Sequence, residues 1–301
     1  MSRFKSESVE ELYGSTPLVK LRSLPDKKHA AVYAKLDYFN PGRSVKDRIA
    51  FGMIRDAEKA GRLKKGRTIV EPSSGNTGIS LALAGRIHGY RVLIVMPDSD
   101  CGSLKDTLLK MGAEVKLTAA EKGMRGARSA AIGLSMKKGK YFMPDQFRNS
   151  LNPEIHKKTT GKELVRAMGK NKVDAFVAGV GTGGTLTGVG EAIRARYPRA
   201  KIVAVEPAES PVLSGGKPGP HGINGIGAGF VPPLLNRNII DDIIAVKTDA
   251  AERMSEKIAK KESLLAGVSS GAVMCAALKT ASGMKNNQNV VAFFADSMAG
   301  V

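Results

Sequence analysis

The stretch RTIVEPSSGNTGISLALAGRIHGYRVLIVMP, residues 67–97, contains one complete unit of alternating structure. Residues 67–72 form a short apolar run, which predicts a strand. Residues 73–89 open with serine, asparagine and threonine and continue with apolar side chains, which predicts a turn followed by a helix. Residues 91–97 are again short and apolar. A strand, a helix and a strand in this order predict a parallel sheet covered by helices.

The same alternation continues on both sides of this stretch. We expect further strands over residues 30–37, 114–118, 173–181 and 201–207, and further helices over residues 45–61, 102–112 and 185–198. The pattern occurs once before about residue 120 and again after about residue 172. The sequence therefore predicts an α/β protein with two three-layer α/β/α domains, mostly parallel twisted sheets and an active site in the cleft between the domains.

The length and composition of the chain exclude several classes of protein. The chain has 301 residues, no apolar run long enough for a membrane span, and an acidic N-terminus unlike a leader peptide. Its two cysteines, Cys101 and Cys275, are far apart, which indicates a reducing, cytoplasmic setting without disulfides. The four histidines lack metal-ligand spacing, so we expect no metal.

The net charge of +19 raises the question of a nucleic-acid partner. The basic residues are spread along the chain, runs such as KKGK at 137–140 are short, and only 5% of residues are aromatic. We therefore interpret the charge as a solvated basic surface and expect neither a nucleic-acid nor a membrane partner.

Lys46 lies in the stretch NPGRSVKDRIA, residues 40–50. After the turn residues 40–42, Ser44 is placed as the N-cap of a helix, so Lys46 falls in its first turn. The helix dipole disfavours a cation there by about 0.3–1 kcal/mol. The position makes sense if this amine is not kept as a free ammonium.

Three glycine- and serine-rich turns are candidate ligand sites. Residues 179–184 fit the dinucleotide fingerprint GxGxxG, with Glu206 at the end of the next strand, but residues 181–185 also suit a single phosphate at a helix N-terminus. Residues 267–271, GVSSG, fit a nucleophile elbow at Ser269, yet no histidine follows the serine, which excludes that hydrolase order. Residues 71–78, EPSSGNTG, suit a carboxylate.

The chain resembles the cysteine synthase (O-acetylserine sulfhydrylase) branch of the fold-type II pyridoxal-phosphate enzymes, over residues 14–297. The resemblance implies a tryptophan-synthase-β-like fold, with a smaller domain over 38–150 and a larger one formed by 1–37 and 151–301. The blocks that carry it are NPGRSVKDRIA, EPSSGNTGISLALAG, DQFRNSLNPEIHKKTTGKEL, GVGTGGTLTGVG, VEPAESPVLSGG, HGINGIGAGFVP and GVSSGA.

The resemblance implies roles for individual residues. Lys46 matches the lysine that binds the cofactor pyridoxal 5'-phosphate as a Schiff base and then acts as the general base. The other cofactor contacts are Asn76 at the ring hydroxyl, Gly181, Thr182, Gly183, Gly184 and Thr185 at the phosphate, and Ser269 at the ring nitrogen. The substrate-binding residues are Ser73, Ser74, Asn76, Thr77, Gln146 and Gly225.

The reaction implied is β-replacement on a serine derivative, giving L-cysteine from O-acetylserine and sulfide through an aminoacrylate. Two alternatives remain open. One is β-elimination or cystathionine- or lanthionine-type replacement starting from serine, cysteine or phosphoserine. The other is a non-enzymatic, basic scaffold or partner-binding protein. The implied partners are a small amino-acid substrate, a second copy of the chain in a homodimer, and the C-terminal tail of a serine acetyltransferase.

The largest departure from the family pattern is MPDSDCGSLKD, residues 96–106. The family usually has Met-Ser, one variable residue and Glu-Arg-Arg after the Met-Pro. We expect residues 98–103 to influence the choice of substrate rather than the cofactor. The end of the chain, ADSMAGV, also departs from the usual Pro-Asp-Ser-Gly run.

Overall fold

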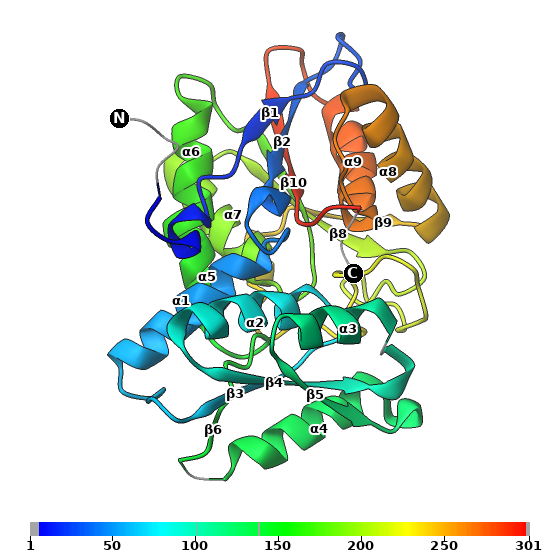
Figure 1. The fold of residues 1–301 in the computed structure, drawn as a ribbon. Helices are drawn as coiled ribbons and strands as arrows, with labels where there is room; N and C mark the ends of the chain where they lie inside the picture. The colour runs from blue at the N-terminus through cyan, green and yellow to red at the C-terminus, as the bar shows by residue number, and fades with distance from the viewer. Residues whose placement is uncertain (1–5, 101, 138, 299–301) are drawn as a thin grey trace. The chain divides into compact units, whose positions relative to one another are not determined.

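The computed structural model describes residues 6–100, 102–137 and 139–298. Cys101 and residues 299–301, about which the sequence raised expectations, lie outside this range. The described chain separates into two compact units, one made of residues 6–13 and 46–149 and the other of residues 14–45 and 150–298. Each unit has its own sheet and its own helices (Figure 1).

The first unit is built on a four-stranded parallel sheet in the order β5-β4-β3-β6. Its strands are β3 (Thr68–Pro72), β4 (Arg91–Pro97), β5 (Glu114–Thr118) and β6 (Tyr141–Phe142). Its helices are α1 (Lys46–Lys59), α2 (Asn76–His88), α3 (Gly102–Lys110) and α4 (Gly123–Ser135). Figure 1 shows α1, α2 and α3 on one face of this sheet and α4 on the other.

Alternate side chains of β3 explain these two layers. Ile69 belongs to the apolar cluster that includes buried residues of α1 and α2, whereas Val70 packs with Ala127 and Ala131 of α4. A strand that is covered on both faces reads as a continuous apolar run, because neither set of alternating side chains meets water.

The second unit is built on a six-stranded sheet in the order β1-β2-β10-β7-β8-β9. Its strands are β1 (Leu18–Lys20), β2 (Ala31–Leu36), β7 (Ala175–Gly179), β8 (Lys201–Pro207), β9 (Asp242–Val246) and β10 (Asn289–Phe294). Only the β1–β2 pair of this sheet is antiparallel among the described strands.

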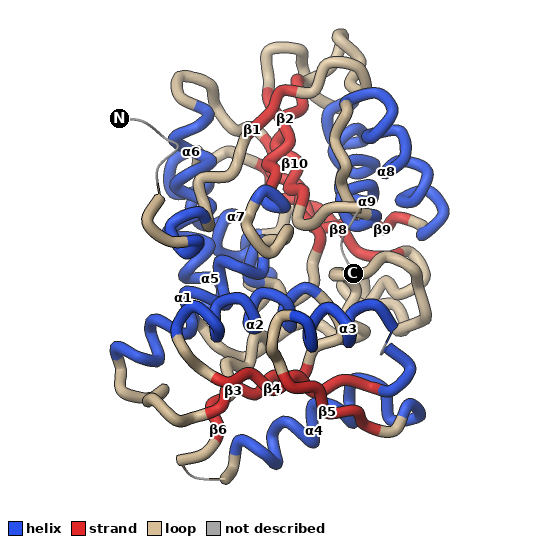
Figure 2. The backbone as a smooth tube through the Cα atoms, viewed as in Figure 1, coloured by secondary structure: helices blue, strands red, loops and turns tan. Residues whose placement is uncertain are grey.

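Helices cover both faces of this second sheet (Figure 2). They are α5 (Leu151–His156), a π-helical turn η5 (Lys157–Gly161), α6 (Lys162–Met168), α7 (Gly184–Arg196), α8 (Thr248–Glu262) and α9 (Val268–Ser282). The α6 and α7 helices pack on one face through Leu164 and Leu186, and α8 and α9 pack on the other. Short 3-10 turns lie at η1 (Val9–Leu12), η2 (Asp37–Phe39), η3 (Asp98–Asp100), η4 (Ala120–Lys122) and η6 (Arg237–Ile239).

Every strand and helix expected from the sequence is present within a few residues of its expected bounds. The apolar face expected for the first helix is also confirmed, since Val45, Ile49, Met53, Ile54 and Ala57 are all buried. Helix α1 begins at Lys46, two residues after Ser44, which forms a β-bridge with Asp296. The N-cap role of Ser44 stays a prediction.

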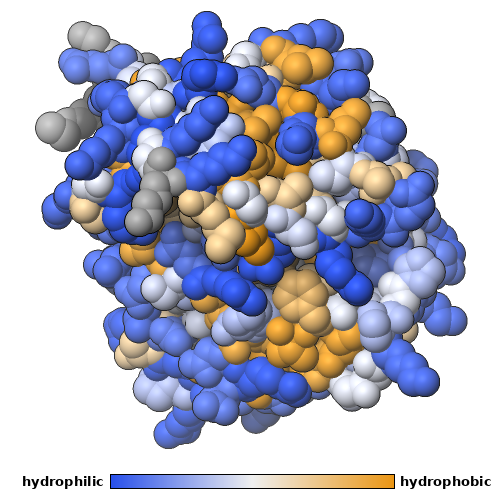
Figure 3. Space-filling view, turned by 90° about the horizontal axis from the view of Figure 1, so that it is seen from below, coloured by the Kyte–Doolittle hydropathy of each residue, from blue (hydrophilic) through white to orange (hydrophobic). Residues whose placement is uncertain are grey.

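No described helix is long and apolar enough to cross a membrane. No group of three or more His, Cys, Asp or Glu side chains within the described residues could hold a metal ion. The face shown in Figure 3 is largely hydrophilic with smaller apolar patches, in keeping with a chain that carries 47 basic residues.

Candidate active site

The turn at residues 181–185 connects β7 to the N-terminus of α7. Gly183 has a φ of +84°, a left-handed conformation that favours glycine. In the described part of the chain, no backbone oxygen accepts a hydrogen bond from the N–H groups of Thr182, Gly183 or Thr185. Such donors at a helix N-terminus form a site for an anion, which the helix dipole also favours.

Close backbone approach explains the glycines of this turn. A Cβ on Gly181 would collide with the carbonyl oxygen of Gly225, and a Cβ on Gly184 would collide with the side chain of Asn152. A Cβ on Gly183 would lie 2.9 Å from the backbone nitrogen of Leu235. The turn is therefore enclosed by neighbouring segments and has no room for larger residues.

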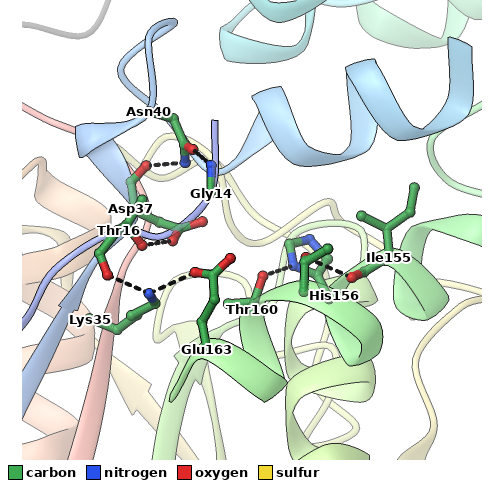
Figure 4. A network of polar contacts seen from close by, with 10 residues as sticks. Gly14, Thr16, Lys35, Asp37, Asn40, Ile155, His156, Thr160 and Glu163 are labelled. Atoms are coloured by element: carbon green, nitrogen blue, oxygen red, sulfur yellow. Dashed lines mark hydrogen bonds and ion pairs between the residues drawn. The ribbon is translucent and has the colours of Figure 1, made fainter. Parts of the chain in front are cut away.

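Two side chains from the helix behind the turn contact its hydroxyl groups. Asn152 Nδ2 donates a hydrogen bond to Thr182 Oγ1 at 3.0 Å. His156 Nε2 lies 3.3 Å from Thr185 Oγ1. Its Nδ1 lies 3.0 Å from Thr160 Oγ1, a contact that Figure 4 shows. Since Thr182 accepts the amide proton, its own hydroxyl proton can point to another acceptor.

A partly buried ion pair joins the sheet to the helical segment that follows α5. Lys35 of β2 is fully buried and its Nζ lies 3.0 Å from Glu163 Oε2, while it also donates to the carbonyl oxygen of Thr16 at 2.6 Å (Figure 4). Glu163 lies seven residues after His156, in α6, which is separated from α5 only by the π-helical turn η5. The ion pair therefore helps to fix the helix that carries His156 and Asn152.

Ser269 lies in the first turn of α9 and is buried. Its Oγ donates a hydrogen bond to Asp296 Oδ1 at 2.8 Å. Gly225 has a φ of +87°, and a Cβ there would lie 3.7 Å from Asp296 Oδ2. The second unit thus brings Gly181, Gly225, Asp296 and Ser269 into one neighbourhood, although they come from four separate segments of the chain.

The contacts of Glu206 and Ser269 argue against two other interpretations of the sequence, a dinucleotide site and a hydrolase nucleophile. Glu206, which a dinucleotide site would direct to a ribose, accepts hydrogen bonds from the N–H groups of Leu213 at 2.7 Å and Ser214 at 3.1 Å and is buried. Its carboxylate is therefore already used to fix a loop. The hydroxyl of Ser269 contacts a carboxylate rather than an imidazole, unlike a hydrolase nucleophile.

The turn at residues 73–77 connects β3 to α2 in the first unit. Ser73 is buried, and its Oγ accepts hydrogen bonds from the N–H groups of Gly75 at 3.3 Å and Gly78 at 3.1 Å. Ser74 is exposed, and Asn76 is the first residue of α2. Ser73 therefore shapes the turn, while Ser74 and Asn76 lie where they could meet a ligand.

The turn is joined to a second segment through Gln146. Thr77 Oγ1 donates to Gln146 Oε1 at 2.8 Å, and both side chains are buried. Glu71 accepts the backbone N–H groups of Asp145 at 2.9 Å and Gln146 at 3.0 Å. Burial raises the pKa of Glu71 to about 7, against the opposing effect of these two N–H donors. The first unit thus places Ser73, Thr77 and Gln146 at the same turn.

Lys46 is the first residue of α1 and is half-buried. The next residue, Asp47, is buried and accepts a hydrogen bond from Ser80 Oγ of α2 at 2.6 Å. This contact fixes the start of α1 against α2, close in the chain to Asn76. The cofactor and substrate residues expected from the sequence are therefore divided between the units: Lys46, Asn76 and the 73–77 turn in one, the 181–185 turn, Gly225 and Ser269 in the other.

Four residues with contacts at these turns have no functional role that the sequence predicts: Glu71, Asn152, His156 and Asp296. Asn152 and His156 lie in the family block at 145–164, which was their only sequence signal. Their partners are distant in the chain, so spacing alone could not assign the contacts.

Comparison with known proteins identifies the family. The family model of pyridoxal-phosphate dependent enzymes matches residues 9–296. A cysteine synthase of Staphylococcus aureus (strain Mu50 / ATCC 700699) is 48% identical over 291 residues, which are 97% of this chain and 94% of the relative.

Solved structures agree with this comparison. The cysteine synthase of Entamoeba histolytica has a TM-score of 0.93 at 39% identity, covering 99% of this chain and 89% of that one. The O-acetylserine-dependent cystathionine β-synthase of Helicobacter pylori has a TM-score of 0.92 at 35% identity, covering 98% and 97%.

These similarities confirm the fold, the cofactor and the enzyme class expected from the sequence. They also contradict the alternative of a non-enzymatic scaffold. The chain belongs to the pyridoxal-phosphate-dependent enzymes, and within that family it is similar to cysteine synthases.

Proposed function

We propose that this enzyme catalyses β-replacement on O-acetylserine, with sulfide as the nucleophile and L-cysteine as the product. The observation that carries the proposal is 48% identity to a cysteine synthase over nearly the whole chain. The presence of two separate anion-binding turns supports it, because the reaction needs one site for a phosphate and one for a carboxylate.

The residues present fit pyridoxal phosphate. The turn at 181–185 offers backbone N–H donors and two hydroxyls, and its glycines allow neighbouring segments to pack closely against it. Ser269 provides a neutral, buried hydroxyl for the ring nitrogen. Asn76 would contact the ring hydroxyl, and Lys46 would hold the cofactor covalently through its amine.

The chain's own groups then have separate tasks. When bound, pyridoxal phosphate supplies an electron sink for negative charge at the substrate's Cα. Lys46 Nζ takes the proton from that carbon. Ser74, Asn76, Thr77 and Gln146 bind the substrate carboxylate, with Ser73 shaping their turn, and Gly225 lines the substrate. The hydroxyl of Ser269 is a much weaker acid than a carboxylic acid, so it can donate a hydrogen bond to the ring nitrogen without protonating it. The proposed reaction requires residues of both units.

A second reaction is β-replacement with a larger thiol, which gives cystathionine-type products. The Helicobacter pylori relative, by its name an O-acetylserine-dependent cystathionine β-synthase, supports this alternative. Both reactions use the same carboxylate and phosphate sites and differ in the nucleophile.

The test is a panel of reactions followed by product analysis. The purified holoenzyme is given O-acetylserine, serine or cysteine, each with sulfide or with homocysteine. We expect L-cysteine from O-acetylserine and sulfide to form fastest. A faster formation of cystathionine, or of products from unmodified serine, would contradict the proposal and favour the alternative.

We also propose that the enzyme is a cytoplasmic homodimer and that it binds the C-terminal tail of a serine acetyltransferase at its substrate site. The proposal rests on the family resemblance. Sedimentation analysis tests the dimer. A synthetic tail peptide that fails to compete with O-acetylserine would contradict the partner.

A further inference from the structure

Glu71 is a buried acid that the proposed reaction does not use. It is the fourth residue of β3 and is 1% exposed. Its two carboxylate oxygens are divided between two neighbouring backbone groups: Oε1 accepts from Gln146 N and Oε2 accepts from Asp145 N. We infer that Glu71 is a positioning residue that, when ionised, holds Gln146 in place for the carboxylate of the amino-acid substrate; this inference rests on the proposed function.

The backbone at Asp145 shows that this segment is held in an uncommon conformation. Asp145 has a φ of +51°, in the left-handed region that few residues other than glycine adopt. Its side chain lies 3.5 Å from Arg128 of α4. Glu71 therefore anchors, from the sheet, a turn whose backbone would relax more easily into another conformation.

The amide of Gln146 is oriented by a second contact in the same unit. Its Oε1 accepts from Thr77 Oγ1 at 2.8 Å, which fixes the two ends of the amide relative to the 73–77 turn. An amide presents an acceptor at the oxygen and donors at the nitrogen. With the oxygen turned to Thr77, Nε2 is the end that can donate to a carboxylate. Glu71 fixes the position of the Gln146 backbone, and Thr77 fixes the orientation of the Gln146 side chain.

The strength of the hydrogen bonds from Asp145 N and Gln146 N to Glu71 depends on the charge of Glu71. A carboxylate accepts both N–H groups well, whereas a protonated carboxyl has one oxygen that is a weak acceptor. The charged groups that act on it among the described residues are Asp145, which raises its pKa, and Arg128, which lowers it. Burial is the largest effect and brings the pKa to about 7, so the charge changes near neutral pH.

The experiment compares the holoenzyme with three variants: Glu71→Gln, Gln146→Ala and the double variant. The probe is L-serine, and its dissociation constant is measured by calorimetry from one pH unit below to one unit above the pKa of Glu71. In the Glu71→Gln variant the amide nitrogen faces an N–H donor, so we expect about tenfold weaker binding than the wild type above pH 7. Below pH 7, where the wild-type carboxyl is protonated, this difference should shrink.

The double variant tests whether Glu71 acts through Gln146. If it does, the effect of Glu71→Gln disappears in the Gln146→Ala background. Glu206→Gln is the matched control, because Glu206 is also buried and also accepts two backbone N–H groups, but in the other unit. This control should leave the pH dependence of L-serine binding as it is in the wild type.

A measurement on the wild-type protein without L-serine keeps the inference testable even if the variants fold poorly. In the wild type, the side-chain carbon of Glu71 and the amide nitrogens of Asp145 and Gln146 should titrate together in NMR spectra. Amide signals that stay constant while Glu71 titrates would overturn the inference.

The binding data separate failure of the inference from failure of the function. Weaker binding in Gln146→Ala together with unchanged binding in Glu71→Gln would overturn the inference alone. Wild-type protein that binds no L-serine, or Gln146→Ala that binds it normally, would overturn the carboxylate site and the inference with it. Normal L-serine binding without cysteine formation would contradict only the proposed reaction.

Discussion

Ser269 Oγ donates its proton to Asp296 Oδ1 across 2.8 Å, a contact between the first turn of α9 and the segment that follows β10. A hydroxyl has a single proton, so in this arrangement Ser269 offers only lone pairs to any further group. In the proposed site that group is a ring nitrogen, which would compete with Asp296 for the same proton.

This competition predicts opposite effects for two alanine substitutions. Ser269→Ala removes the hydroxyl and should weaken pyridoxal-phosphate binding, by up to about tenfold. Asp296→Ala releases the proton of Ser269 and removes a negative charge, so binding should be equal or tighter. Fluorescence titration of the cofactor-free protein measures both constants. Equal weakening in the two variants would show that Asp296 supports the site rather than competing within it.

Lys46→Ala should abolish turnover and leave the fold intact. Lys46 is half-buried at the first position of α1, where the dipole disfavours its charge and alanine is a good helix former, so stability should change by less than about 1 kcal/mol. Lys59→Ala, at the other end of the same helix, is the control and should retain activity.

A chemical label tests the same assignment independently. Borohydride reduction of the wild-type holoenzyme, followed by peptide mapping, should place the pyridoxyl group on Lys46. A label on any other lysine would disprove the assignment.

Gly183→Asp should remove the cofactor. The aspartate would be strained at a φ of +84°, its Cβ would lie 2.9 Å from Leu235 N, and its charge would repel a phosphate. Gly215→Asp is the matched control, because Gly215 has a φ of +88° but no atom within 4 Å of an added Cβ. We expect normal cofactor content in the control and loss in Gly183→Asp, both measured by absorbance. Equal content in the two proteins would refute the phosphate site.

The strands that could be predicted from the sequence are those buried on both faces. The runs at β3, β4, β7 and β8 are short and mostly apolar, which identifies them without knowledge of their neighbours. The place of β10 could not be predicted. It pairs with β2 through Asn289 and Ala31 and with β7 through Val290 and Ala175, partners that are far away in the chain.

The same limit applies to the candidate site. The glycine-rich turns could be predicted as anion sites because their donors are local to a strand end and a helix start. The contact of Glu71 with Gln146 spans 75 positions in the chain, and that of Asn152 with Thr182 spans 30. Only the folded chain brings these groups together, so no local sequence motif predicts their contacts.

Residues 98–103 should affect the choice of substrate without affecting the cofactor. They follow β4, form the 3-10 turn Asp98–Asp100 and enter α3, although Cys101 lies outside the described residues. A family-like run grafted over 100–105 must keep Leu104, which is buried. We expect altered ratios of the rates with O-acetylserine, serine and cysteine, and an unchanged cofactor spectrum. Unchanged ratios would mean that this segment has no influence on the choice of substrate.

Glu71 should also make the free energy of unfolding depend on pH. In the unfolded chain its pKa returns towards the ordinary value of 4.5, whereas in the folded protein burial raises it to about 7. Between these values the folded state binds more protons, so the stability due to Glu71 is fully present below about pH 4.5 and is lost as the pH rises through 7. The difference corresponds to on the order of 3 kcal/mol.

Glu71→Gln cannot titrate, so the difference in stability between wild type and variant should change with pH over this window. Urea unfolding of both proteins at a series of pH values measures it, and taking the difference removes the contribution of other titrating groups. Because L-serine binding is expected to strengthen over the same window as stability falls, the two trends should oppose one another. If binding and stability instead rose and fell together, Glu71 would be a purely structural acid. A wild-type and variant pair with parallel stability curves would contradict the raised pKa itself.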